Sequence, residues 1–199
     1  HNDKYVMGVD LGTTNTVIAL ANLNGNILEK IRVPTIRDHS VETVINQVSD
    51  LVNDLIEESQ IKKKLIKGIG IAEAGIVEKN TGKIKFSPNF NWENVNIAKE
   101  LEKRTGLSTL ADNCTRTMAL GELWHGNGKG IKNIFYVNVG YGVGSALVLN
   151  GKVQQTIRGT GTYGQLEIDN RQGARLEDDI TLTKDLILTQ GILDINDQL

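Results

Sequence analysis

The sequence has little of what several protein classes require. It holds one cysteine, Cys114, so an intrachain disulfide and a cysteine-rich zinc site are excluded, and a reducing compartment, the cytoplasm, is expected. The 22 basic and 24 acidic residues leave a net charge of −2, and no long run of either sign indicates a nucleic-acid-binding surface. No stretch approaches the roughly 18 apolar residues of a membrane span. We therefore expect an ordinary globular protein with no membrane partner.

Short apolar runs separated by polar turns predict an α/β protein that begins with strands. Asn24-Gly25 is a strong hairpin signal between two of these runs. Ser40 is placed to cap a helix whose apolar residues follow at helical spacing. We expect a glycine-punctuated loop after residue 72, strands at 5–10, 16–21, 27–33, 67–72, 107–111, 133–139 and 146–149, and helices at 96–104, 115–124 and 176–193.

The beginning and the later part of the sequence share one order of elements: apolar strand, glycine-rich turn, apolar strand, Asn-Gly, strand. Gly12 lies in the first turn, and Gly142 lies in the second, 130 residues later. Internal duplication is the simplest explanation of this repeat. The alternative is that two hairpins are alike by chance, because Gly and Asn-Gly are common turn residues.

The first of these turns has the chemistry of a phosphate site. Asp10 ends a strand and is followed by Gly12, Thr13, Thr14 and Asn15. Small residues let the backbone approach a phosphate, N–H groups and hydroxyls donate to it, and the carboxylate can hold a hydrated Mg²⁺. No Gly-Lys-Ser/Thr follows, so this is not a Walker loop, and a strand follows where a Rossmann fingerprint needs a helix. A tight polar hairpin is the alternative.

Residues 8–16, Gly-Val-Asp-Leu-Gly-Thr-Thr-Asn-Thr, resemble the first phosphate loop of the actin, Hsp70 and sugar-kinase superfamily. Gly140, Gly142 and Gly144 fall where that superfamily has its second phosphate loop. The intervening segments follow the order seen in the ROK family, which groups bacterial sugar kinases with sugar-responsive transcriptional repressors. These segments are 68–77, 81–82, 87–92, 112–114 and 119–122.

The resemblance runs from Tyr5 to about Gly164. It implies an α/β fold of the actin-like, ribonuclease H-like kind, with duplicated lobes in which helices flank a mixed sheet. Residues 1–118 are expected to form the N-terminal lobe. Residues 119–199 are expected to form a second, truncated lobe.

The position of the kinase base departs from the family pattern. The resemblance places this general base, an aspartate in the kinases, at Cys114. A thiol has a reference pKa near ~8.5 and lacks the two-oxygen grip of a carboxylate on a hydroxyl, so it is a poor substitute. A slip in the correspondence would place Asp112 or Asn113 there instead.

Other positions that kinase chemistry needs also differ. Tyr141 stands where the second phosphate loop of the kinases has a threonine, so its ring would crowd a nucleotide. Gln165 and Ile168 stand where the family has a glutamate and a histidine that grip the sugar. No cysteine cluster follows, so no metal is expected.

The resemblance still assigns possible ligand contacts, at Gly75, Asn89, Asn113, Cys114, Gln165 and Glu167. Trp92 is expected to be a packing anchor, with stacking on a sugar as the alternative. Trp124 follows Leu120 at helical spacing and is expected in the core.

Together these features predict the sugar-sensing domain of a ROK-type transcriptional regulator, with no catalytic residue and no cofactor. The expected partners are a small-molecule sugar, a second copy of the chain and DNA, the last only through a helix-turn-helix that is not in this chain. The first alternative is an ATP-dependent sugar kinase, with Mg-ATP as cofactor. The second is an actin-like scaffold that binds no small ligand.

Overall fold

The computed structural model describes residues 4–78, 81–139, 143–149, 152–154, 161–163, 166–169, 174–175, 180–182, 186–190 and 193–194. The chain divides into two compact units, His1–Cys114 and Thr115–Leu199. Within the described ranges, no helix is both long and apolar enough to cross a membrane.

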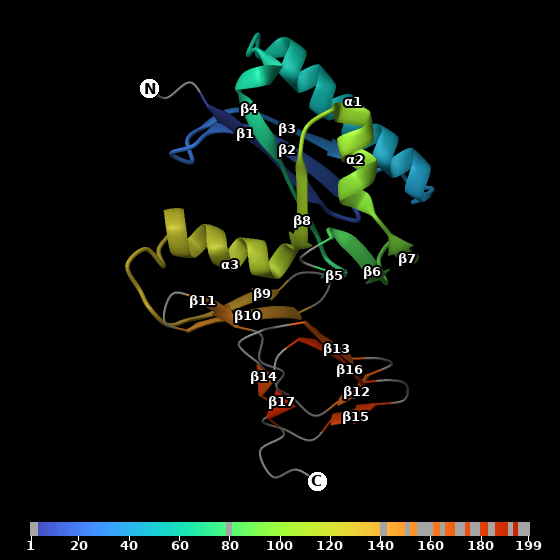
Figure 1. Cartoon of the computed structure of the whole chain (residues 1–199), viewed down its shortest axis with the longest axis vertical. Helices are drawn as coiled ribbons and strands as arrows, with labels where there is room; N and C mark the ends of the chain where they lie inside the picture. Colours follow the sequence, from blue (N-terminus) through green and yellow to red (C-terminus); the bar gives the residue numbers. More distant parts are fainter. Residues whose placement is uncertain are drawn as a thin grey trace. The chain divides into compact units, whose positions relative to one another are not determined.

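A five-stranded mixed sheet organises the first unit, with the order β3-β2-β1-β4-β8 (Figure 1). The first three strands form an antiparallel meander, and the other two join it in parallel. The carboxyl ends of β1, β4 and β8 therefore meet at one edge of the sheet, which is where open α/β sheets place their ligands. The bounds are β1 Tyr5–Leu11, β2 Asn15–Asn22, β3 Ile27–Pro34, β4 Ile66–Glu73 and β8 Thr109–Asn113.

Helices α1 (Val41–Glu58) and α2 (Ile97–Thr105) lie side by side against one face of this sheet (Figure 1). The Ser40 side chain accepts a hydrogen bond from the Thr43 N–H and caps α1, which confirms the predicted start of this helix. Gly106 ends α2 with a φ of 64°, a left-handed conformation that glycine adopts without strain. A short 3₁₀ helix, η1 (Lys63–Leu65), leads into β4.

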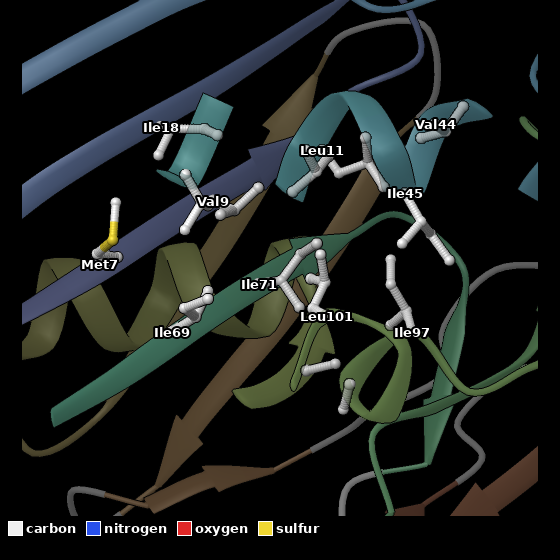
Figure 2. Packing of buried hydrophobic residues seen from close by; sticks show 14 of the residues in the cluster. Met7, Val9, Leu11, Ile18, Val44, Ile45, Ile69, Ile71, Ile97 and Leu101 are labelled. Atoms are coloured by element: carbon white, nitrogen blue, oxygen red, sulfur yellow. The ribbon is translucent and has the colours of Figure 1, made fainter. Parts of the chain in front are cut away.

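The core of the first unit lies between the sheet and these helices (Figure 2). Every second residue of β1 and β4 points into it because side chains alternate along a strand. Removing such side chains from water contributes about 1.5–3 kcal/mol each. The labelled members come from β1, β2, β4, α1 and α2, and are Met7, Val9, Leu11, Ile18, Ile69, Ile71, Val44, Ile45, Ile97 and Leu101.

Alternate strand residues point to the opposite face of the same sheet. There Leu110 is 74% exposed. A Cβ added to Gly8 or to Gly70 would meet no atom within 4 Å. One face of the sheet thus carries the core, and the other face is open above Gly8 and Gly70 and exposes Leu110.

A small antiparallel sheet occupies the stretch where the sequence predicted a loop. Its strands are β5 (Ile76–Glu78), β6 (Lys83–Ser87) and β7 (Trp92–Val95), in the order β5-β6-β7. The prediction of a loop was wrong because these strands have three to five residues, too few for an alternating pattern to stand out.

Trp92 anchors this small sheet. Its side chain is 3% exposed and stacks on Phe90 with ring centroids 4.6 Å apart. The indole N–H donates to the His39 carbonyl at 2.7 Å. The expectation of a packing anchor is confirmed.

The second unit repeats the meander of the first. Strands β9 (Ile134–Val139), β10 (Val143–Leu149) and β11 (Lys152–Gln154) pair antiparallel in the order β11-β10-β9, as β3-β2-β1 do. This repetition is what internal duplication predicts. Helix α3 (Cys114–His125) covers one side of the β9–β10 pair, where its Ala119 packs with Ala146 and Val148.

The predicted burial of Trp124 is wrong, because the side chain is 60% exposed. The buried residues of α3 are Thr115 and Ala119, which lie four apart on one face of the helix. Trp124 follows Ala119 by five residues, which rotates it by about 140° from that face.

The helices expected at 176–193 are also contradicted, because the residues described there, 180–182, 186–190 and 193, lie in strands. Its residues are rich in Ile, Leu and Thr, and β-branched side chains lose rotamer freedom in a helix but fit a pleated strand. Parallel pairs β12-β15, β13-β16 and β14-β17 form there. The bounds are β12 Gly161–Tyr163, β13 Leu166–Asp169, β14 Ala174–Arg175, β15 Ile180–Leu182, β16 Leu186–Gln190 and β17 Leu193–Asp194.

Candidate functional site

The predicted phosphate-loop residues lie at the junction of β1 and β2. Asp10 is near the end of β1, Gly12, Thr13 and Thr14 form the turn, and Asn15 begins β2. The Gly12 N–H donates to the Asn15 carbonyl at 3.1 Å. A Cβ on Gly12 would lie 2.7 Å from that carbonyl oxygen. Only glycine fits this tight turn, because a real Cβ cannot approach an oxygen so closely.

Thr35 holds this turn in place from the end of β3. Its hydroxyl donates to the Gly12 carbonyl at 2.6 Å, and its N–H donates to the Thr14 carbonyl at 3.0 Å. The Thr16 hydroxyl lies 2.9 Å from the Thr35 hydroxyl. Since the one proton of Thr35 is directed at Gly12, Thr16 is the donor in that bond. Both threonines are buried, so the loop rests on a closed set of hydrogen bonds.

Asp10 lies on the face of the sheet opposite the helices. It is paired in register with Val17 of β2, which in turn is paired with Arg32 of β3. Partial burial of the Asp10 carboxyl raises its pKa, and the positive charge of Arg32 opposes that rise. No hydrogen bond from the described residues acts on this carboxylate. It is therefore available to a donor or a cation from outside the protein.

At the neighbouring strand end, Glu73 closes β4 with its side chain inside the protein. It is 1% exposed. One carboxylate oxygen, Oε2, accepts from the Gly75 N–H at 2.6 Å, and the other, Oε1, accepts from the Ser87 hydroxyl at 2.6 Å. Burial raises the pKa of Glu73, and the hydrogen bonds from Ser87, Gly75 and Ala74 lower it.

Gly75, one of the predicted sugar contacts, is enclosed by this network. A Cβ there would lie 2.6 Å from Glu73 Oε2 and 2.9 Å from the Ser87 Cα, and close to the Phe86 carbonyl oxygen. The backbone of the loop therefore approaches its neighbours as closely as a glycine allows.

Asn113, a second predicted contact, belongs to the same network. Its Nδ2 group donates to the carbonyls of Ala74 at 3.2 Å and Gly75 at 3.0 Å. Because both partners are carbonyl oxygens, the nitrogen must face them, and the direction of Oδ1 is fixed. Cys114 follows as the first residue of α3, with a half-buried side chain that forms no disulfide. The structure thus brings Gly75, Asn113 and Cys114 to one end of the sheet.

Other predicted site residues are placed elsewhere or are not described. Asn89 lies exposed in the turn between β6 and β7, outside the network of Glu73. Gly144 lies in β10, where an added Cβ would clash with the Thr115 hydroxyl. Gly140, Gly142 and Gln165 lie outside the described residues, and Glu167 is described only as part of β13.

Sequence reasoning missed Thr35 and Glu73. Glu73 did leave a signal, because it follows Ile69 and Ile71 at the spacing of two that marks the buried face of a strand. Thr35 left none that we recognise. Among the described residues, no group of three or more His, Cys, Asp or Glu side chains could hold a metal ion.

The chain is similar in sequence to known proteins. The ROK family model matches residues 6–173. A glucokinase of Halalkalibacterium halodurans is 30% identical over 174 residues, which are 87% of this chain and 53% of that enzyme. A xylose repressor of Caldicellulosiruptor bescii is 28% identical over 148 residues, which are 74% of this chain and 37% of the repressor.

Solved structures agree with the sequence comparisons. The ROK family glucokinase from Streptomyces griseus, in complex with glucose and AMPPNP, matches with a TM-score of 0.68 at 25% identity over 75% of this chain and 46% of that one. A ROK family transcriptional regulator, a homologue of the E. coli MLC protein, matches with a TM-score of 0.70 at 25% identity over 77% of this chain and 38% of that one.

The chain has an actin-like α/β fold, as the sequence predicted, and its structural neighbours include a ROK family glucokinase. The chain belongs to the ROK family. Its relatives include both glucokinases and xylose repressors. The chain spans about half, or less, of the length of the curated relatives it matches.

Proposed function

We propose that this chain is the sugar-sensing domain of a ROK-type transcriptional regulator and has no kinase activity. The observation that carries the proposal is the pair of residues at the carboxyl end of β8, Asn113 and Cys114. There Asn113 is held by two backbone carbonyls, in an orientation that we propose serves a sugar hydroxyl, and the next residue is Cys114. In this proposal the site has an oriented binding group, and a thiol stands where the resemblance places the carboxylate of the kinases.

Binding and phosphoryl transfer make different demands on such a site. A sensor needs hydrogen-bonding groups that are fixed before the sugar arrives, because prior order lowers the entropy cost of binding. A kinase also needs a base that takes a proton from the sugar hydroxyl and a positioned, charge-neutralised phosphate. The fixed amide of Asn113 meets the first demand. A thiol meets the second demand poorly, because it is a poor substitute for a carboxylate base.

An ATP-dependent sugar kinase is the second candidate, and the first loop favours it. Asp10 has a carboxylate without a hydrogen bond from the described residues, and Gly12 forms the tight turn that follows it. These groups fit Mg-ATP in part. When bound, the metal would neutralise phosphate charge; the chain itself would supply Asp10 to hold it, and Cys114 or Asp112 to accept the proton.

As a sensor, the domain would act through its partners. The names of the relatives indicate glucose or xylose, so a hexose or a pentose is the proposed ligand class. The bound sugar would favour one arrangement of the protein over another by its differential affinity. We infer that this change is passed to a second copy of the chain, and to DNA through a helix-turn-helix outside this sequence.

Calorimetric titration with a panel of hexoses, pentoses and amino sugars tests the proposal, together with a coupled assay of ATP turnover. We expect saturable binding of one sugar and no turnover. Asn113→Ala should weaken binding about tenfold, the loss of one or two hydrogen bonds. The matched control Asn53→Ala, exposed on α1, should leave it unchanged. Sugar-dependent turnover that Asp10→Ala abolishes would instead establish the kinase.

A scaffold that binds no small ligand is separated from both by thermal shift. A bound sugar stabilises the folded state by RT ln(1 + [L]/Kd). If no sugar in the panel, with or without Mg-ATP, raises the melting temperature, the scaffold is the better description.

A further inference from the structure

We propose that Glu73 is a positioning residue for the sugar: it fixes Gly75 and, through the Gly75 carbonyl, the amide of Asn113. Glu73 itself touches no ligand, because it and Ser87 are 1% and 0% exposed. The inference rests on the proposed function, since it assigns a role within the same strand-end site.

The contacts form a continuous path from Glu73 to Asn113. Glu73 Oε2 accepts from the Gly75 N–H at 2.6 Å. The Gly75 carbonyl in turn accepts from Asn113 Nδ2 at 3.0 Å. The strands reinforce the path, because Glu73 is paired in register with Leu11 of β1 on one side and with Asn113 of β8 on the other. Glu73 is therefore central to the edge where all three parallel strands end.

If Glu73 served only to hold the turn, its side chain would not need to carry a charge. Among residues 4–78, 81–139 and 144–148, Glu73 is the only charged side chain that is buried. Burying a carboxylate is costly even when it is hydrogen-bonded. A turn can be held by a neutral serine or asparagine at less cost. A charged acceptor does give shorter and stronger bonds, which is what a loop needs if it must not yield when a ligand binds.

Two variants of Glu73 distinguish the role of its hydrogen bonds from the role of its charge. Glu73→Gln keeps the shape: its Oε1 can accept from Gly75 and its Nε2 can donate to the Ser87 oxygen. Glu73→Leu leaves the Gly75 N–H without a partner. Ser87→Ala is the matched control, because it removes the bond to Oε1 and leaves the Gly75 bond in place. All three are compared at equal folded fraction, measured by circular dichroism.

The positions of Gly75 and Asn113 are read without any ligand, from ¹H–¹⁵N spectra of the full chain. In Glu73→Leu we expect the Gly75 amide and the Asn113 side-chain amide both to shift and to lose protection from exchange. In Glu73→Gln and Ser87→Ala the Asn113 signals should stay near their wild-type values. Unchanged Asn113 signals in Glu73→Leu would overturn the proposed path.

Sugar affinity is then measured with whichever sugar of the panel the wild type binds. Glu73→Leu should weaken binding about tenfold, the equivalent of one well-formed hydrogen bond, and Glu73→Gln about threefold or less. Equal affinity in all three variants would mean that Glu73 serves stability alone, which overturns the proposal. If the wild type binds no sugar, the proposed function fails, and the spectra alone decide whether Glu73 positions Asn113.

Discussion

Replacing Thr35 with valine tests how far the first loop depends on one side chain. The substitution keeps the shape but removes the hydroxyl that donates to the Gly12 carbonyl at 2.6 Å and accepts from Thr16 at 2.9 Å. Two neutral hydrogen bonds contribute about 0.5–1.5 kcal/mol each. Thr16 is 1% exposed, so its hydroxyl would be left without water. We expect a loss of about 2–3 kcal/mol in the free energy of unfolding.

Urea unfolding followed by Trp92 fluorescence measures this loss in the first unit. Trp92 is buried and Trp124 is 60% exposed, so a Trp124→Phe background leaves one reporter in the region of interest. Thr35→Ser, which keeps the hydroxyl, should lose clearly less than Thr35→Val.

The double variant Thr16→Val/Thr35→Val sharpens the test. Removing both partners of a buried bond with groups of similar shape leaves no orphaned hydroxyl. Its cost should therefore be smaller than the sum of the two single costs. Strict additivity, or a Thr35→Val variant within about 0.5 kcal/mol of wild type, would refute the idea that Thr35 braces the loop.

Three further outcomes follow from the same structure. Burial raises the pKa of Glu73, so the free energy of unfolding of the wild type falls as pH rises from the ordinary glutamate value near ~4.3 through the native pKa. The free energy of unfolding of Glu73→Gln should therefore rise relative to that of the wild type over that window. Urea midpoints at several pH values that show a constant difference between the two proteins would contradict this. Gly75→Ala places a Cβ 2.6 Å from Glu73 Oε2, and should cost about 1–3 kcal/mol in thermal unfolding. Leu101→Ala, at a site 0% exposed, should cost about 2–5 kcal/mol, whereas Leu110→Ala, at a site 74% exposed, should change stability by about 0.5 kcal/mol or less.

The local signals in the sequence predicted the framework of the first unit. Ser40 caps α1 as expected, and the apolar runs became strands, because strand alternation and helix capping depend on residues a few positions apart. The same reasoning failed at Trp124. Its four-residue spacing from Leu120 was right for a helix, but which side of α3 is buried depends on the strands that pack there.

The candidate site was predicted only in part for a similar reason. The family resemblance pointed to Gly75 and Asn113, and the structure joins them through hydrogen bonds. The residues that hold the loops in place were missed, because Glu73 and Ser87 are 14 residues apart and Thr35 and Gly12 are 23 apart. Short-range patterns carry no information on such pairings.

The order of the strands bears on how the protein forms during synthesis. The meander β1–β3 and its brace at Thr35 lie within the first 35 residues or so, whereas the bond between Gly75 and Asn113 spans 38 positions and needs two parallel crossovers. Contacts distant in sequence form more slowly because a longer segment must be ordered first. The half of the edge that resembles a phosphate site can therefore take shape on the ribosome while the half proposed for the sugar is still being translated.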